Sequence, residues 1–207
     1  MAKRLIYPFF LIVFMIGFYN LILMNNAIKE TIVTDGIVFE RLEEAVLAGY
    51  GKNDRLTLLQ TGEKNVNIHY VLYAINQEQL MSELFYKSEA GYERIIDSRL
   101  IIGGTSLQDA EYKIRTFLIT DGPWLTNGTP FTYVTIGYIQ TPEQVDNVEI
   151  RYEELYKKVA VENQSFFNIA SSTHQWDTLH PIIFYDQNRE EIGGYLTDLV
   201  VSGAYCH

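Results

Sequence analysis

The segment HQWDTLH, residues 174–180, carries the densest group of possible metal ligands in the chain, namely His174, Asp177 and His180. Two imidazoles and a carboxylate can bind a transition metal. Their spacing matches no standard metal motif, however, and polar residues are ordinary in a loop before a proline such as Pro181. We therefore predict no metal site. The alternative, which stays open, is that His174, Asp177 and His180 serve a membrane-anchored hydrolase or a metal-binding protein.

The remaining motifs predict no catalytic chemistry. The sequence has no G-x-S-x-G, no P-loop and no G-x-G-x-x-G. Ser106 follows Gly103 and Gly104, but no histidine or acid is marked as its partner, so a turn is the simpler interpretation. Adjacent acids such as Glu153 and Glu154 do not place two carboxylates across a cleft, as glycosidases require. We predict no catalytic residue, no cofactor-binding residue and no cofactor.

Residues 5–24, LIYPFFLIVFMIGFYNLILM, form a run without a charged side chain. Twenty helical residues extend about 30 Å, which matches the hydrocarbon core of a bilayer. A cleaved signal peptide would have a shorter apolar core and a small-residue cleavage site, and a buried core helix would seldom be this long without a charge. We predict an uncleaved transmembrane signal anchor, with a cleaved signal and a core helix as alternatives.

The charges that flank this run predict its orientation. Lys3 and Arg4 precede it, and the positive-inside rule places them in the cytoplasm. Residues 1–4 would then be a cytoplasmic tail, and the rest of this single-pass protein would lie outside the cell membrane. Asn20 within the run either reaches the outer interface, which we favour, or forms an interhelical hydrogen bond that drives self-association.

Charge and cysteine content restrict the partners. All 26 acidic residues but only 14 of the 16 basic ones follow residue 24, so the outer part carries a net charge of about −12. Nucleic acid and anionic lipid headgroups would be repelled by such a surface. Cys206 is the single cysteine, which excludes an intramolecular disulfide and is typical of bacterial rather than eukaryotic outer domains.

After the anchor, the pattern predicts an α+β fold that is mostly β. Residues 25–54 form a juxtamembrane, partly helical segment, because Phe39, Leu42, Ala45 and Val46 recur at helical spacing. Residues 55–207 form an extracytoplasmic domain resembling a β-sandwich or a curved sheet, with one or two short helices and a possible sub-boundary near 123–130.

Short apolar runs separated by turn residues predict the individual strands. They are 56–60, 66–75, one or two within 92–102, 112–120, 131–140, 145–152, 157–161, 165–170, 181–185 and 191–196. Residues 77–86 favour a short helix instead. Gly137 is predicted to form a bulge, Asn163 and Gln164 a hairpin tip, and His69 an exposed strand position.

A hairpin pattern of the form K-x-x-V-x-x-x-x-F-F, followed by a D-x-N turn, stands out in the second half of the chain. The residues that form it are Lys158, Val161, Phe166, Phe167, Asp186 and Asn188. With these residues, the chain resembles, over about residues 66–194, a module of uncharacterised membrane-anchored or secreted β-rich proteins of Gram-positive bacilli. The resemblance implies a β-rich extracytoplasmic domain and no activity.

Aromatic side chains are dense in this half, and the sequence leaves open whether they form a core or an exposed binding patch for a polypeptide or glycan. They are Tyr133, Tyr138, Tyr152, Tyr156, Phe166, Phe167, Trp176, Phe184 and Tyr185. We predict a non-enzymatic binding or regulatory module of the bacterial cell envelope. It would be attached to the membrane through residues 5–24, with a possible protein partner and no nucleic acid.

Overall fold

The computed structural model describes residues 32–103, 106–107, 111–126, 128–141, 144–176, 181–196 and 199–202, with backbone only at 199, 201 and 202. The predicted membrane span, Asp177, His180 and Cys206 lie outside these residues. Within the described ranges, none of the helices has the length and apolarity needed to cross a bilayer. The chain divides into two units, Met1–Ile32 and the compact Val33–His207.

Three sheets make up this unit. The first has the strand order β1-β2-β3-β4, with β5 also paired to β3. All of its pairs are antiparallel. Its strands are β1 (Leu56–Asn65), β2 (Ile68–Ile75), β3 (Gln79–Ser88), β4 (Gly91–Arg94) and β5 (Leu100–Ile102).

The second sheet has the order β10-β7-β6-β13 and the third the order β12-β11-β8-β9. Only β13 runs parallel to its neighbour, β6. The strands of the second sheet are β6 (Tyr112–Ile119), β7 (Phe131–Ile139), β10 (Ser165–Ser172) and β13 (Leu199–Ser202). Those of the third are β8 (Asn147–Arg151), β9 (Tyr156–Ala160), β11 (Pro181–Tyr185) and β12 (Glu191–Leu196).

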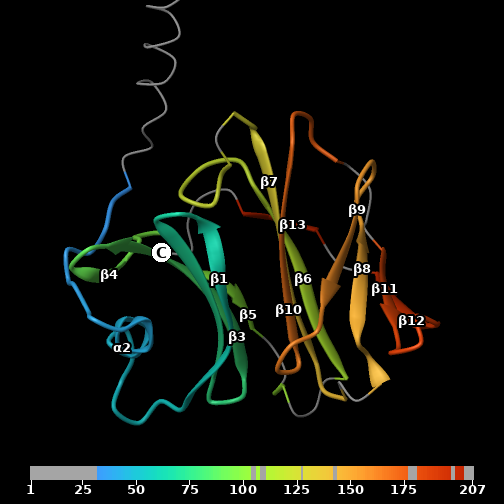
Figure 1. The fold of residues 1–207 in the computed structure, drawn as a ribbon, viewed down its shortest axis with the longest axis horizontal. Helices are drawn as coiled ribbons and strands as arrows, with labels where there is room; N and C mark the ends of the chain where they lie inside the picture. The colour runs from blue at the N-terminus through green and yellow to red at the C-terminus, as the bar shows by residue number, and fades with distance from the viewer. Residues whose placement is uncertain are drawn as a thin grey trace, which may run out of the picture. The chain divides into compact units, whose positions relative to one another are not determined.

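The second sheet lies between the other two (Figure 1). Seven of the nine residues of β7 are buried, because both faces of the strand are covered. On one face of this second sheet, the ring of Phe167, on β10, stacks on Tyr70 of the first sheet, with ring centroids 3.9 Å apart. On the other face, Tyr133 and Ile139 share a core with Val148 and Phe184 of the third sheet. The unit is therefore a stack of three sheets around two apolar layers.

A short helix, α2 (Leu42–Leu47), covers the outer face of the first sheet (Figure 1). Ala45 and Val46 of the helix pack against Val71, Tyr73 and Phe85. Before the helix, isolated bridges of Thr34 to Ile95 and Phe39 to Tyr92 extend the sheet beyond β4. The predicted juxtamembrane helix is thus six residues long, and extended chain precedes it.

The mostly β prediction is confirmed, but the helix predicted over 77–86 is wrong, because β3 occupies these residues. Leu80 and Leu84 lie on one face of the strand and Met81 and Phe85 on the other, and all four are buried. A strand covered on both faces has no alternation of apolar and polar residues, so its pattern resembles that of a helix.

The bulge predicted at Gly137 is also absent. Gly137 pairs in regular register with Ile114 on one side and Phe166 on the other. A Cβ at this position would overlap the ring of Phe166, which lies across the glycine. Gly137 therefore provides space for an aromatic ring and does not interrupt the strand.

Candidate functional site

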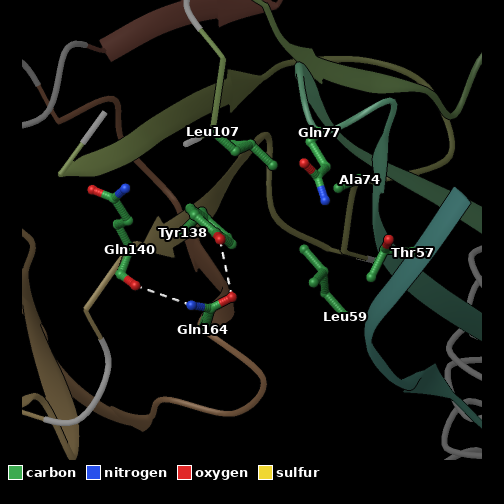
Figure 2. Close-up of a pocket in the computed structure, with 8 residues that line it drawn as sticks. All are labelled: Thr57, Leu59, Ala74, Gln77, Leu107, Tyr138, Gln140 and Gln164. Carbon is green, nitrogen blue, oxygen red and sulfur yellow. Dashed lines mark hydrogen bonds between the residues drawn. The ribbon is translucent and has the colours of Figure 1, made fainter. Parts of the chain in front are cut away.

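A cleft of about 320 Å³ lies between one end of the first sheet and the facing end of the second sheet. This volume is at the lower end of the range of roughly 300–1,000 Å³ found for small-molecule sites. Thr57, Leu59 and Ala74 form the wall on the first sheet, and Figure 2 shows Tyr138, Gln140 and Gln164 opposite them. Gln77 and Leu107 complete the lining.

Two tight turns place glutamines at this cleft. Asn76 and Gln77 lie in the hairpin turn between β2 and β3. Asn163 and Gln164 form a two-residue hairpin tip closed by the Glu162–Ser165 bridge, but β9 and β10 on either side belong to different sheets and do not pair with each other. All four residues have positive φ, at 53°, 59°, 47° and 64° respectively. Asparagine tolerates this left-handed region, but glutamine has no local side-chain bond that favours it. The hairpins thus hold two glutamines in a backbone conformation of some cost, in which their side chains reach the cleft.

The side chain of Gln164 is fixed by two hydrogen bonds, drawn in Figure 2. The Tyr138 hydroxyl donates to Gln164 Oε1 over 3.0 Å, and Gln164 Nε2 donates to the Gln140 carbonyl oxygen over 3.0 Å. Asn163 Nδ2 in turn donates to the Leu59 carbonyl oxygen over 2.9 Å and so connects the hairpin tip to the first sheet. These bonds hold the polar wall of the cleft in one geometry.

The polar groups of this wall are uncharged. Burial raises the pKa of Tyr138 above its ordinary value, so its hydroxyl stays protonated at neutral pH. Its cross-strand neighbour, Lys113, donates a hydrogen bond from its ammonium group to the Glu78 carbonyl oxygen, next to Gln77, over 2.6 Å. Amide and hydroxyl groups can both donate and accept hydrogen bonds, so the cleft suits a neutral polar ligand.

Only one of the three predicted metal-ligand candidates, His174, lies within the described residues. Its side chain is 50% exposed, and its Nε2 lies 3.6 Å from Glu154 Oε1. Its ring meets the edge of Trp176. Within the described part of the chain, no three His, Cys, Asp or Glu side chains gather closely enough to hold a metal ion. His174 is not part of the cleft wall.

His69 does not have the exposure that the sequence predicted, since only 8% of it is accessible. It lies on the face of β2 that α2 and the N-terminal extended chain cover, and its ring contacts the edge of Tyr92 at 5.6 Å between centroids. The apolar residues on the other face of β2 predicted a half-buried strand. The burial of Val71 and Tyr73 beside His69 shows that both faces are covered.

Sequence reasoning missed a buried ionic cluster beneath α2. Glu83, 1% exposed, accepts hydrogen bonds from Arg94 Nη1 over 3.2 Å and from Arg99 Nε. Arg94 also donates through Nη2 to the Ala45 and Val46 carbonyl oxygens at the end of α2, over 2.9 and 3.1 Å. The cluster therefore attaches the helix to the sheet. No motif marks it, because its members are 11 and 16 residues apart and converge only through strand pairing.

The dense aromatic residues of the second half mostly form a core. Trp176 stacks on Tyr133 and Tyr152, with centroids 4.4 and 5.0 Å away. The Tyr152 hydroxyl receives a bond from Asn168 over 2.7 Å and shares one with Thr135 over 3.0 Å, and burial raises its pKa to about 12. Tyr156, 67% exposed, is the clearest exception.

Comparisons with family models, with curated proteins and with solved structures find no match for this chain. The resemblance to envelope proteins of Gram-positive bacilli stays a prediction from the sequence.

Proposed function

We propose that this protein is a non-enzymatic binding module of the bacterial cell envelope that holds a neutral, polar ligand in the cleft between the first and second sheets. The observation that carries this proposal is the wall of amide and hydroxyl groups held rigid by Tyr138, Gln164 and Asn163. A preformed wall binds with little loss of conformational entropy, which favours recognition.

A neutral saccharide fits this wall better than a charged ligand. Sugar hydroxyls both donate and accept hydrogen bonds, as do the amides of Gln77 and Gln164 and the hydroxyls of Thr57 and Tyr138. The apolar lining from Leu59, Ala74 and Leu107 offers contact to the carbon face of a sugar ring. The net negative charge of the domain also disfavours an anionic ligand.

The cellular setting of the proposal comes from residues 5–24. As an uncleaved anchor with Lys3 and Arg4 in the cytoplasm, this run would place the three-sheet unit outside the membrane. The protein would then be a single-pass membrane protein that presents its cleft to soluble or wall-bound saccharides.

The test is a titration of the full-length chain, in detergent micelles, with neutral oligosaccharides and with uncharged peptides of similar size. Gln164→Asn is the diagnostic variant, because asparagine suits the positive φ but shortens the side chain that contacts Tyr138 and Gln140. We expect saccharide affinity to fall roughly 10-fold, as the loss of one or two neutral hydrogen bonds implies.

Arg189→Asn is the matched control, because Arg189 also has positive φ, at 66°, and lies in the turn between β11 and β12. It should leave saccharide affinity unchanged. Equal affinity of the Gln164→Asn variant and the wild type would exclude the cleft as the binding site. Binding of the peptides alone would replace the saccharide with a polypeptide ligand.

A further inference from the structure

The cleft between the first and second sheets is apolar at its inner end and polar at its mouth. Leu59, Ala74 and Leu107 line it but are only 6%, 3% and 3% exposed, so they form its floor. Thr57 and Gln77 also line it and are exposed, so they lie at the opening. A ligand that fills this cleft therefore needs a small apolar group at its leading end and polar groups directly behind it.

An irregularity in β1 helps to build this floor. The register of the strand shifts between Leu58 and Gln60, so Leu59 has no partner of its own on β2. Bulges of this kind redirect side chains and are common beside functional sites. Figure 2 shows the side chains of Leu59 and Leu107 pointing into the same space. Two leucines thus present their methyl groups to the inner end of a ligand.

The amide of Gln164 keeps hydrogen-bonding capacity for that ligand. A primary amide has two N–H donors and two acceptor lone pairs. The Tyr138 hydroxyl uses one lone pair of Oε1, and the Gln140 carbonyl oxygen uses one hydrogen of Nε2. One donor and one acceptor of a fixed amide therefore remain in the cleft. They match the carbonyl oxygen and the N–H of an amide on the ligand.

We propose that the cleft binds the acetamido group of an N-acetylated sugar. This inference rests on the proposed saccharide function and names the class of sugar. The methyl group contacts the floor formed by Leu59, Ala74 and Leu107, and the amide behind it exchanges hydrogen bonds with Gln164. A sugar without this group brings a hydroxyl to the apolar floor, where an unpaired hydroxyl costs free energy.

The test compares identically linked tetramers of N-acetylglucosamine and of glucose, which differ only in the acetamido group that replaces one hydroxyl of each ring. Both are titrated into the full-length chain in micelles of a detergent without a sugar headgroup. We expect the acetylated tetramer to bind about 10-fold more tightly, because it adds the burial of one methyl group and one hydrogen bond. In saturation-transfer NMR, the acetyl methyl protons should give the largest signal.

Ala74→Val is the diagnostic variant, because the larger side chain occupies the space of the acetyl methyl group while valine suits a strand. The ratio of the two affinities should fall toward one. Ala160→Val is the matched control, since it makes the same substitution at an exposed position of β9, outside the cleft. It should keep the wild-type ratio. Thermal unfolding checks that both variants fold.

Equal affinity of the wild type for the two tetramers would overturn the acetamido proposal and leave a neutral saccharide in the cleft. A ratio that Ala74→Val leaves unchanged would also overturn it, because the acetyl group would then bind elsewhere. Binding of neither tetramer would exclude the proposed saccharide function as well. Equal affinity for N-acetylalanine amide would assign the acyl group to a peptide and exclude the sugar.

Discussion

His69 shows how one residue's burial acts on stability. Burial, and secondarily the charge of Lys87, lower the pKa of its imidazole below the ordinary value of 6.5, whereas Glu63 acts in the opposite direction. The folded state therefore keeps His69 neutral where the unfolded chain already binds a proton. Below about pH 6.5 the unfolded state gains protons and the folded state does not, so the stability of the fold decreases as the pH falls.

We predict that His69→Gln reduces the loss of folding stability that accompanies a fall in pH. Thermal unfolding of the wild type and the variant at pH 7.5 and 5.5 measures it, because carboxylate titration is common to both proteins. The melting temperature of the variant should fall less between the two pH values. His174→Gln removes a half-exposed imidazole and serves as the control. Equal reductions in the two variants would contradict a specific role for the burial of His69.

The same residue marks a limit of prediction from sequence. Alternation along β2 correctly indicated a strand, but the pattern could not reveal that a segment about 30 positions earlier covers its second face. The cleft was missed for a similar reason, because contacts between distant segments form it. The turn at Asn163 and Gln164 was predicted from local chemistry, whereas its position against Leu59 depends on a hydrogen bond between residues 104 positions apart.

At the scale of elements, the Glu83 cluster helps to hold α2 on the sheet. The helix has six residues and no side-chain cap at its N-terminus, so its own hydrogen bonds contribute little stability. Arg94 satisfies two carbonyl groups at its C-terminal end and neutralises Glu83 below it. Arg94 therefore adds a polar attachment to the apolar packing of Ala45 and Val46 on the sheet.

We predict that Arg94→Met destabilises the fold by about 3 kcal/mol, because removing one partner of a buried ion pair leaves the other incompletely neutralised. The midpoint of urea unfolding measures the change. Arg41→Met is the matched control, since Arg41 and Glu43 form an exposed pair at 3.9 Å. It should cost less than about 0.5 kcal/mol. Similar losses for the two variants would show that the cluster does not attach the helix.

The elements were predicted best where turns were distinct. β11 and β12 have the predicted bounds because Pro181 and the turn at Asp186 limit them. β3 was mistaken for a helix because its two buried faces remove the alternation on which strand prediction depends. Gly137 was mistaken for a bulge because a glycine that accommodates a ring and a glycine that bends a strand are identical in sequence.

At the scale of the whole molecule, stacking explains why sequence alone could not choose between one sandwich and two small units. Two of the three sheets combine segments from distant parts of the chain. β13 returns from the C-terminal region to pair with β6, and β11 pairs with β8 across the intervening β9 and β10. Such pairings follow from long-range packing, which leaves no periodic pattern in the sequence.

The proposed orientation of the whole protein leads to a last prediction. If residues 5–24 are an N-in anchor, a cysteine in the three-sheet unit should react with a membrane-impermeant thiol reagent in intact bacterial cells. Lys52→Cys in a Cys206→Ser background places a thiol in the exposed loop between α2 and β1. Ala2→Cys in the same background should react only after the membrane is permeabilised.

Because the two thiols differ only in their side of the membrane, labelling of Ala2→Cys but not Lys52→Cys in intact cells would reverse the orientation. Release of the protein by alkaline carbonate would instead exclude an uncleaved anchor.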